Sequence, residues 1–243
     1  MEMENPLIEI RDLRFAYPDG TRALQGVTLE VGRGETIGLI GSNGAGKSTL
    51  LLHLNGILRG EGRVRILGME ATEKNLPELR RRVGMVFQDP ENQLFMPTVY
   101  DDVGFGPLHL GRPKGEVDDA VRRALAAVDM LAFIERTPHH LSIGEKKRIA
   151  IATVLSMDPE ILVLDEPSSN LDPRHRRELM TLLERLSITK IIASHDLDFI
   201  SRTCSRVALL DAGVILASGG TAAILGDRAL MGRFGMLDPP ATT

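Results

Sequence analysis

The chain has little cysteine and lacks long apolar runs. Cys204 is the single cysteine among 243 residues, so no disulfide can form within the chain. No apolar segment reaches the length of a membrane-spanning helix, and residues 1–6 are acidic and polar rather than basic and then apolar. We therefore expect a cytoplasmic protein without a signal peptide or anchor, which reaches a membrane only through a partner.

The chain also lacks a basic excess. Lys and Arg number 29 against 33 Asp and Glu, which gives a formal net charge of -4. Domains whose main partner is nucleic acid usually carry a positive surface, so we expect no nucleic-acid partner. With 43% hydrophobic residues, a chain of this length can bury a core without a disulfide or a structural metal.

Short apolar runs alternate with helical segments along most of the chain. β-rich runs separated by glycine turns fill the first third, and the pattern becomes helical after Lys47, with Leu50, Leu51, Leu54 and Leu58 on one face. Buried-strand runs return later between helical segments, as a parallel sheet requires, so the fold class is α/β. The expected strands are 7–17, 27–31, 36–40, 83–87, 161–164, 190–193 and 207–210, with a closing hairpin strand at 214–217.

This alternation breaks in the middle and at the end of the chain. A polar stretch with several prolines covers 88–113, and a further fold unit is expected there. Apolar residues then recur at helical spacing, which predicts an amphipathic helix from Gly115 to Arg136. The residues after Asp227 end in Asp-Pro-Pro-Ala-Thr-Thr and predict a partly disordered tail.

A glycine-rich loop connects the strand predicted at 36–40 to the following helix. Its sequence fits the pattern G-x4-G-K-[ST], and the strand–loop–helix context is the one that phosphate binding needs. Glycines let backbone N–H groups surround the β- and γ-phosphates, while Lys47 supplies positive charge and Ser48 a hydroxyl ligand for Mg²⁺. The alternative is a turn that merely joins strand to helix. The candidate nucleotide-binding residues are Gly41, Ser42, Asn43, Gly44, Ala45, Gly46, Lys47, Ser48 and Thr49.

Two adjacent carboxylates follow the apolar run 161–164. Asp165 and Glu166 stand at the C-terminal edge of a predicted strand, where open α/β sheets bind ligands. Asp165 is the candidate Mg²⁺ ligand, and Glu166 the candidate base that polarises the water attacking the γ-phosphate. Without the glycine-rich loop, we would interpret the pair as acids that cap a turn before Pro167. The sequence thus predicts hydrolysis of ATP with Mg²⁺ as cofactor.

The segment Leu141-Ser142-Ile143-Gly144-Glu145 resembles the signature sequence of ATP-binding cassette (ABC) ATPases. In that family the signature of one subunit closes over the ATP held by the phosphate loop of another, so the resemblance implies that two chains sandwich two nucleotides. Ser142 and the following amides would begin a helix whose positive end faces the γ-phosphate. The resemblance implies nucleotide contacts for Ser142, Gly144 and Glu145.

Further positions match the family in order along the chain. Tyr17 resembles the aromatic residue that stacks on adenine, Gln88 the glutamine between core and helical subdomain, and His195 the histidine that contacts the γ-phosphate. Residues 169–172 resemble the D-loop, which makes Asp172 a candidate nucleotide-binding residue. The resemblance implies catalytic roles for Glu166, His195 and Gln88, and Mg²⁺ contacts for Ser48, Gln88 and Asp165.

The chain departs from the commonest signature at two positions. Ile143 replaces a glycine and Glu145 a glutamine, while Ser142 and Gly144, which lie nearest the phosphate, are kept. We therefore expect slower or differently tuned closure rather than loss of activity. In the D-loop, Asn170 stands where a small residue is common, and nothing in the sequence explains that choice.

The stretch after the glutamine resembles one branch of the family. Residues 88–95, 98–107 and 138–140 are similar to ATPases of energy-coupling-factor importers, with those of cobalt or nickel uptake as the nearest likeness. In that branch, the residues after the glutamine line a groove for the coupling helices of a transmembrane partner, with apolar tips expected here at Leu94 and Phe95. The alternative is a solvated loop with both residues turned inward.

The resemblance implies a single ABC nucleotide-binding domain over 1–226. Residues 1–88 and 158–226 would form an N-terminal antiparallel β subdomain and a RecA-like core of the P-loop NTPase fold. Residues 89–157 would form the inserted helical signature subdomain and 227–243 the tail. The expected partners are a second ATPase subunit, in a homodimer or heterodimer, a transmembrane coupling subunit and a membrane substrate-binding subunit. The chain would lie at the cytoplasmic face of the cell membrane as a peripheral protein.

Other functions share this chemistry. An importer for another micronutrient, such as a vitamin, would carry the same motifs. An ABC ATPase of DNA repair or chromosome organisation usually contains a long coiled coil, and the interval 88–141 has no sustained heptad run. A module that senses ATP without cleaving it would be expected to lack Glu166 or His195, and both are present. The favoured function is to energise a membrane importer of cobalt or nickel ions.

Overall fold

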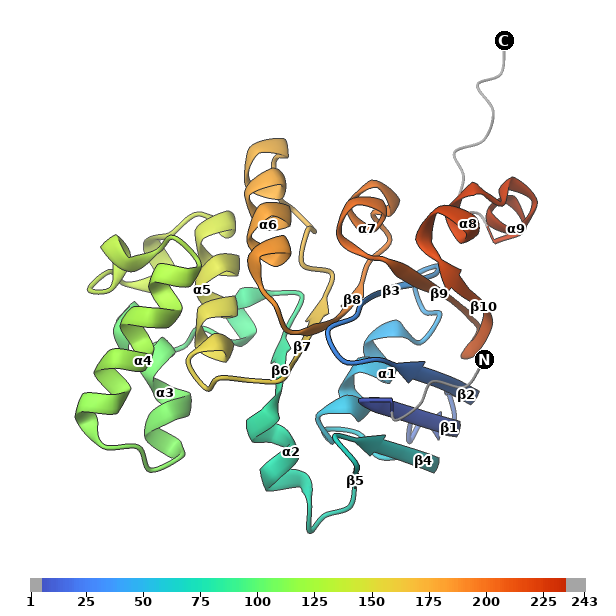
Figure 1. The fold of residues 1–243 in the computed structure, drawn as a ribbon, viewed down its shortest axis with the longest axis horizontal. Helices are drawn as coiled ribbons and strands as arrows, with labels where there is room; N and C mark the ends of the chain where they lie inside the picture. The colour runs from blue at the N-terminus through green and yellow to red at the C-terminus, as the bar shows by residue number, and fades with distance from the viewer. Residues whose placement is uncertain (1–5, 235–243) are drawn as a thin grey trace. The chain divides into compact units, whose positions relative to one another are not determined.

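A computed structural model describes residues 6–234 (Figure 1). The chain divides into two compact units, one made of the residues up to Leu79 and from Thr189 onward, the other of Arg80–Ile188. The segment 89–157, predicted as a helical subdomain, lies within the second unit. In the part of the chain that the model describes, no helix is long and apolar enough to cross a membrane.

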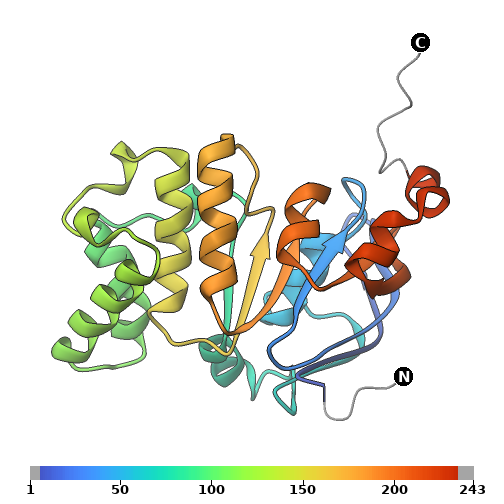
Figure 2. The same ribbon diagram turned by 45° about the horizontal axis from the view of Figure 1, so that its top comes forward.

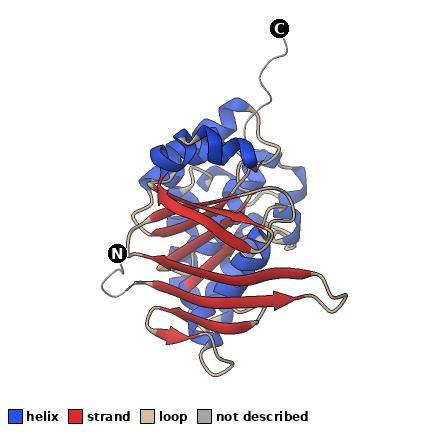
Figure 3. Ribbon diagram, turned by 90° about the vertical axis from the view of Figure 1, so that its right-hand side faces the viewer, coloured by secondary structure: helices blue, strands red, loops and turns tan. Residues whose placement is uncertain are grey.

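The first unit contains an antiparallel sheet in the order β2-β1-β4-β5, whose long strands are visible in Figure 3. Strand β2 begins five residues earlier than the predicted run at 27–31. Gly26 has a φ of +99° and interrupts the apolar pattern between the buried Leu24 and Val27, so the sequence run alone does not reveal the first half of the strand. The strands are β1 (Ile8–Ala16), β2 (Arg22–Val31), β4 (Glu61–Ile66) and β5 (Met69–Glu70).

The same unit contains a second set of strands in the order β10-β9-β3-β8. Strand β3 is parallel to both β8 and β9, and β10 pairs antiparallel with β9 as a hairpin. Ile37, Leu39 and Ile40 of β3 are completely buried, as expected of a central strand. The predicted strands and the α/β class are confirmed here by β3 (Thr36–Ile40), β8 (Thr189–Ala193), β9 (Arg206–Asp211) and β10 (Val214–Gly220).

The helices of the first unit differ from the predictions at two places. The helix after the glycine-rich loop ends at Leu54, because Gly56 follows in a left-handed conformation, so Leu58 is not part of it. Residues 228–233, placed in the tail by sequence, form a helix whose Met231 is fully buried, and 235–243 lie outside the described residues. The helices are α1 (Lys47–Leu54), α7 (Leu197–Thr203), α8 (Thr221–Gly226) and α9 (Arg228–Arg233), while α2 (Leu76–Arg82) leads into the second unit.

Cys204 follows α7 and is 6% exposed. Its Sγ would lie 3.3 Å from a Cβ added to Gly38, so the thiol packs against the central strand β3. Burial raises the pKa of Cys204 to about 11. The thiol therefore stays protonated at neutral pH.

The second unit combines a parallel strand pair with a group of helices. Strand β6 (Val83–Val86) pairs with β7 (Ile161–Asp165), and all nine of these residues are buried. Helices α3, α4 and α5 pack against one another (Figure 1), and α6 lies beside α5 (Figure 2). The helices are α3 (Val99–His109), α4 (Lys114–Ala127), α5 (Ile143–Leu155) and α6 (Pro173–Arg185), with 3₁₀ turns η1 (Pro90–Asn92), η2 (Leu131–Phe133) and η3 (Pro138–His140).

Two sequence predictions for the second unit need correction. The helix predicted from Gly115 to Arg136 ends at Ala127, because Asp129 adopts a left-handed conformation with a φ of 58° and the chain turns there. Helix α3 lies in the stretch 88–113, where a further fold unit within the helical subdomain was expected but no individual helix was placed. Thr98 starts it by accepting a hydrogen bond from the backbone N–H of Asp101, and Pro107 falls in its last turn.

Candidate active-site residues

The glycine-rich loop between β3 and α1 is packed closely against neighbouring backbone. A Cβ on Gly41 would lie 2.1 Å from the carbonyl oxygen of Leu210, and one on Gly46 would lie 2.5 Å from that of Ala23. Both glycines also have positive φ, of +155° and +105°. Only glycine fits both the space and the backbone conformation. The loop residues 42–44, in contrast, are exposed and accessible to a ligand.

Lys47 folds back over this loop. Its Nζ donates to the carbonyl oxygens of Gly41 at 2.8 Å and Ser42 at 3.1 Å, although the residue is only 7% exposed. Gly46, the N-cap of α1, has no side chain that could cap the first amides of the helix and compete there with an anion. Ser48 is exposed beside them. The arrangement suits a phosphate chain with a hydroxyl ligand for Mg²⁺.

Tyr17 is hydrogen-bonded to α1, the helix that follows the loop. Its hydroxyl lies 3.0 Å from the Oγ1 of Thr49, and its ring meets Phe15 edge to face with 5.0 Å between the ring centroids. Thr49 is 6% exposed, so its hydroxyl serves Tyr17. The geometry therefore gives Thr49 a positioning role in addition to the nucleotide contact predicted for it.

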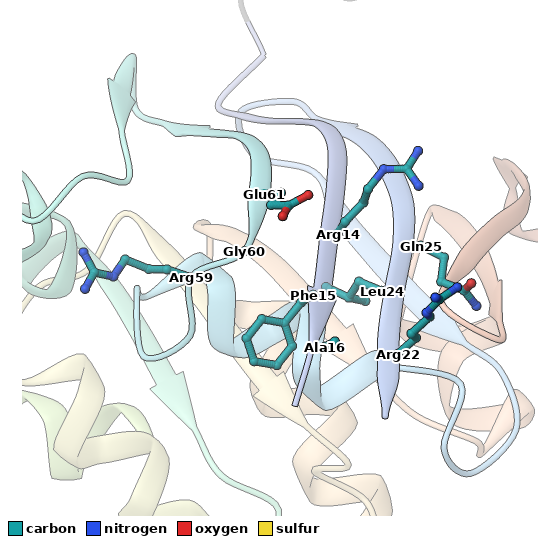
Figure 4. A pocket seen from close by; sticks show the side chains of 9 residues that line it. All are labelled: Arg14, Phe15, Ala16, Arg22, Leu24, Gln25, Arg59, Gly60 and Glu61. Atoms are coloured by element: carbon teal, nitrogen blue, oxygen red, sulfur yellow. The ribbon is translucent and has the colours of Figure 1, made fainter. Parts of the chain in front are cut away.

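A cavity of about 490 Å³ adjoins this aromatic pair (Figure 4). The side chain of Phe15 extends from β1, and those of Arg22 and Gln25 extend from β2. The residues that line it do not include 41–48, but one of them, Leu24, would lie 3.2 Å from a Cβ added to Gly46 of the loop. Its lining consists of Arg14, Phe15, Ala16, Arg22, Leu24, Gln25, Arg59, Gly60 and Glu61.

His195 lies at the same sheet edge as the loop. The register of the parallel pair places Leu39 of β3 opposite Ala193 of β8, and the backbone N–H of Ser194 donates to the carbonyl of Leu39 at 3.1 Å. His195 and Gly41, each two residues beyond this pair, therefore emerge side by side at the carboxyl edge. His195 is exposed there.

In the second unit, Gln88 and the two acids emerge together. Val86 of β6 is opposite Leu164 of β7, so Gln88 and Glu166 follow neighbouring strand ends. Asp165 is 7% exposed and Glu166 6%, whereas Gln88 is exposed. A cavity of about 430 Å³ lies here. Its lining consists of Phe87, Gln88, Asp89, Pro90, Asn92, Ile143, Lys147, Asp165 and Asn170.

The signature segment begins α5 with a capping box. The Oγ of Ser142 accepts from the backbone N–H of Glu145 at 3.4 Å, and a carboxylate oxygen of Glu145 accepts from the N–H and the hydroxyl of Ser142, both at 2.8 Å. Burial alone would raise the pKa of Glu145, but the bonds from Ser142 outweigh it and the pKa is lowered. The predicted helix start is confirmed, and Glu145 acquires a structural reason to be present.

The D-loop and the signature helix meet through a histidine. A Cβ on Gly144 would lie 2.7 Å from the ring of His175, whose Nδ1 is 2.5 Å from a carboxylate oxygen of Asp172. Asp172 also caps α6, and its hydrogen bond with His175 lowers the pKa of Asp172 to about 2. Asn170 has a φ of 59°, a conformation that asparagine tolerates well, which accounts for the residue that the sequence left unexplained.

The expected pair of apolar tips after Gln88 is reduced to one. Leu94 is 3% exposed, whereas Phe95 is 59% exposed, so the prediction was wrong for Leu94. Asp102 anchors this segment, because one of its oxygens accepts from the backbone N–H groups of Phe95 and Met96, both at 3.0 Å. Burial raises the pKa of Asp102. Sequence reasoning missed Asp102, since an acid within a helix gives no sign of being buried.

Phe95 is the first of three aromatic side chains whose rings contact one another in sequence. Its ring meets that of Phe105 edge to face at 5.2 Å, and the ring of Phe105 lies 4.0 Å from that of His109. Leu108, one residue before His109, is 61% exposed. We call Phe95, Phe105 and His109 the aromatic strip. Exposed aromatic groups of this kind are enriched where proteins meet partners.

The fold and the loop define a phosphate-loop nucleoside-triphosphatase. Residues 24–169 match the family model described as ABC transporter. The chain belongs to the ABC transporter family and is one of its ATPases, so the sequence-based expectations of the family and of the P-loop NTPase fold are confirmed.

Relatives match over nearly the whole chain. The Streptomyces coelicolor protein SCO3161 is 54% identical over 92% of this chain and 86% of its own length. The energy-coupling factor transporter ATP-binding protein EcfA of Carboxydothermus hydrogenoformans is 48% identical over 97% of this chain and 88% of its own.

Solved structures agree. That of cbiO1 from Clostridium perfringens, described as part of the ABC transporter complex cbiONQ, has a TM-score of 0.84 at 38% identity and covers 95% of this chain and 94% of that one. The dimeric structure of MJ0796, a bacterial ABC transporter cassette, has a TM-score of 0.80 at 26% identity and covers 88% of this chain and 98% of that one.

Replacing Lys47 by alanine should weaken Mg-ATP binding about 10- to 100-fold, the range expected when a charge-assisted hydrogen bond worth about 1.5–3 kcal/mol is lost. Calorimetric titration with Mg-ATP measures this. Lys114→Ala, at an exposed position on α4, is the control and should bind normally. Unchanged affinity in Lys47→Ala would contradict the assignment of the phosphate loop.

Replacing Glu145 by glutamine should lower stability at neutral pH by about 0.5–1 kcal/mol, because a charged acceptor at a helix N-terminus is lost. The folded-state pKa of Glu145 lies below its ordinary value of 4.5, so the benefit is complete above that value and disappears as the pH falls through the lowered folded-state pKa. Urea unfolding of both proteins between neutral pH and about pH 3 should show the difference shrinking on acidification. Glu116→Gln, in the first turn of α4 where no side-chain cap forms, should show a smaller change. A gap independent of pH would refute this account.

Proposed function

We propose that this chain is the ATP-hydrolysing subunit of an energy-coupling-factor importer for cobalt or nickel ions. The observation that carries the membrane partner is the aromatic strip, in which Phe95 of the segment after Gln88 is 59% exposed, His109 is exposed and Phe105 between them is half-buried. The relative named EcfA and the neighbour cbiO1, described as part of the complex cbiONQ, support the choice of importer branch. The chain would be attached at the cytoplasmic face of the cell membrane through its partner.

The phosphate loop would hold ATP. Its exposed amides and the first turn of α1 surround the phosphates, while Lys47 and His195 place positive charge and a hydrogen-bond donor near the γ-phosphate. Tyr17 would stack on adenine. Mg²⁺ bound with the nucleotide supplies positive charge against the developing charge of the transferred group, and Ser48, Gln88 and Asp165 offer the oxygen ligands that it prefers.

Glu166 would orient the attacking water. It is buried at the end of β7, so its carboxylate can be held in one direction, and no covalent intermediate is required. Gln88, at the end of the neighbouring strand, lies close enough to link hydrolysis to whatever binds the segment behind it.

A second copy of the chain, or a related ATPase subunit, would complete each pocket. Ser142, Gly144 and Glu145 lie at the N-terminal end of α5, where the capping box joins Ser142 and Glu145, and would close over the γ-phosphate of the other chain. The dimeric structures of MJ0796 support this assembly. ATP binding then favours the closed dimer and hydrolysis reopens it.

The choice of ion belongs to the membrane subunits in this proposal. The site residues of this chain contact nucleotide and partner, so the same ATPase could serve an importer of another micronutrient. An ATPase of DNA repair or chromosome organisation is disfavoured, because the interval between Gln88 and Leu141 is filled by the short helices α3 and α4 and by 3₁₀ turns.

Glu166→Gln should reduce ATP turnover about 10²- to 10³-fold and accumulate a dimer with Mg-ATP, because removing a general base blocks the step that reopens the pair. Phosphate release and light scattering after size exclusion measure the two effects. Glu184→Gln, on the exposed face of α6, is the control. Brisk hydrolysis by Glu166→Gln would remove Glu166 from its role. A chain that stays monomeric with Mg-ATP while turnover is blocked would exclude the composite pocket.

Phe95→Asp should abolish co-purification with a membrane protein, because a carboxylate cannot enter an apolar contact without losing its hydration. Leu131→Asp, at another exposed apolar residue of the second unit, should retain it. The purified complex, reconstituted in vesicles, should take up cobalt or nickel with ATP. Recovery of DNA without a membrane protein would overturn the transport proposal, and uptake of a vitamin instead would overturn only the choice of substrate.

A further inference from the structure

Lys147 is a buried lysine at the centre of the second unit. It stands on α5, five residues after Ser142, and is 4% exposed. Its Nζ donates to the carbonyl oxygens of Gln88 at 3.2 Å and Glu166 at 3.1 Å, and to the Oγ of Ser169 at 3.0 Å. An ammonium has three donors, so each of them has one acceptor.

The surroundings explain how the charge is tolerated. Burial lowers the pKa of Lys147 to about 8, while Glu166, Asp89 and Asp165 act in the opposite direction and favour the charged form. A buried charge is costly unless it is paired and hydrogen-bonded. The acceptors come from two loops, the one that follows β6 at Gln88 and the one that follows β7 at Glu166 and Ser169, so the same bonds that stabilise the ammonium also hold these two loops together.

One of these loops has a strained backbone. Glu166 has a φ of 43°, in the left-handed region that residues other than glycine occupy only when their neighbours fix them there. The carbonyl of Glu166 accepts from the Nζ of Lys147 and also from the Oγ of Ser169 at 2.8 Å and the backbone N–H of Ser169 at 3.1 Å. These three bonds fix the peptide that follows Glu166, and with it the direction in which the Glu166 side chain leaves the backbone.

The segment that follows Gln88 makes further contacts with α5, the helix that carries Lys147. Lys146 makes an ion pair with Glu91 at 2.7 Å. Further along α5, the side-chain amide of Gln93 donates to the carbonyl of Ala150 at 2.9 Å and to the Oγ1 of Thr153 at 2.8 Å. With the bond from Lys147 to Gln88, the segment is joined to α5 over about two turns. The segment and the helix are thus expected to move together.

We propose that Lys147 is a positioning residue for hydrolysis: it holds the peptide of Glu166 in the conformation that directs the carboxylate, and it transmits displacement of the segment 88–95 to that peptide. A partner that shifts the segment therefore changes the direction of Glu166 and the rate of hydrolysis. The inference rests on the role proposed above for Glu166, and it requires no membrane partner to be tested.

The experiment measures kcat and KM for Mg-ATP hydrolysis by the full chain. Lys147→Met removes the three donors and keeps most of the length of the side chain, Lys147→Arg keeps charge and donors, and Lys114→Met is the control. Lys147→Met should lower kcat about tenfold or more, with KM changed less than about twofold, because an interaction that matters only for the reacting state is lost. Lys147→Arg should recover part of kcat.

A double-mutant cycle separates positioning from general damage. If Lys147 acts through Glu166, Lys147→Met should change the residual turnover of Glu166→Gln less than about twofold, measured in a long single-turnover time course. A tenfold loss in both backgrounds would overturn the proposal, because the lysine would then act independently of Glu166. A kcat within about twofold of the wild type in Lys147→Met would overturn it as well.

Ser169→Ala provides a second test if Lys147→Met does not fold. Ser169 is half-buried and supplies the other side-chain donor to the Glu166 carbonyl, so the same fall in kcat with KM preserved is expected. Unchanged kcat in that variant would overturn the proposal. Slow turnover in Glu166→Gln with normal turnover in Lys147→Met rejects the lysine alone, whereas normal turnover in Glu166→Gln rejects the role proposed for Glu166.

Discussion

The backbone of the glycine-rich loop depends on one electrostatic interaction, between the ammonium of Lys47 and the carbonyl oxygens of Gly41 and Ser42. A short loop contains as many carbonyls as amides, and a phosphate repels the first as strongly as it attracts the second. By donating hydrogen bonds to two of these carbonyls, Lys47 offsets their partial negative charge within the protein. The close contacts of Gly41 and Gly46 with neighbouring strands then leave the loop little freedom to rearrange.

The second unit uses charge in a similar way. The carboxylate of Glu145 holds the start of α5, and that of Asp172 holds the start of α6 together with His175. Lys147 joins the loop after β6, at Gln88, to the loop after β7, at Glu166. Each of these charged groups is fully hydrogen-bonded or close to an opposite charge, so the unit fixes irregular loops at precise positions without a larger apolar core. The segments near Gln88, Glu166 and Asn170 are the ones that this arrangement orders.

Much of this could be predicted from sequence, for reasons that also explain the failures. The strands β3, β7 and β8 are continuous apolar runs because they are buried on both faces, and the glycine-rich loop has a strict pattern because its backbone is crowded. Ser142 and Glu145 have the spacing of a capping box. A helical subdomain was expected over 89–157, but α3 was not placed within it because Pro107 and polar residues hide its pattern, and the end of α4 depends on the backbone of Asp129 alone. Lys147 was missed because a buried lysine between Lys146 and Arg148 looks like part of a solvated basic run.

The burial of Cys204 has a practical consequence. Thiol reagents attack the thiolate, and this thiol is both covered and protonated at neutral pH, so the folded protein should react slowly. Labelling then requires the packing between α7 and β3 to open. Because the chain has no second cysteine, the rate of labelling reports the opening of that one contact, and the native sequence already carries a reporter of local unfolding next to the strand that leads into the glycine-rich loop.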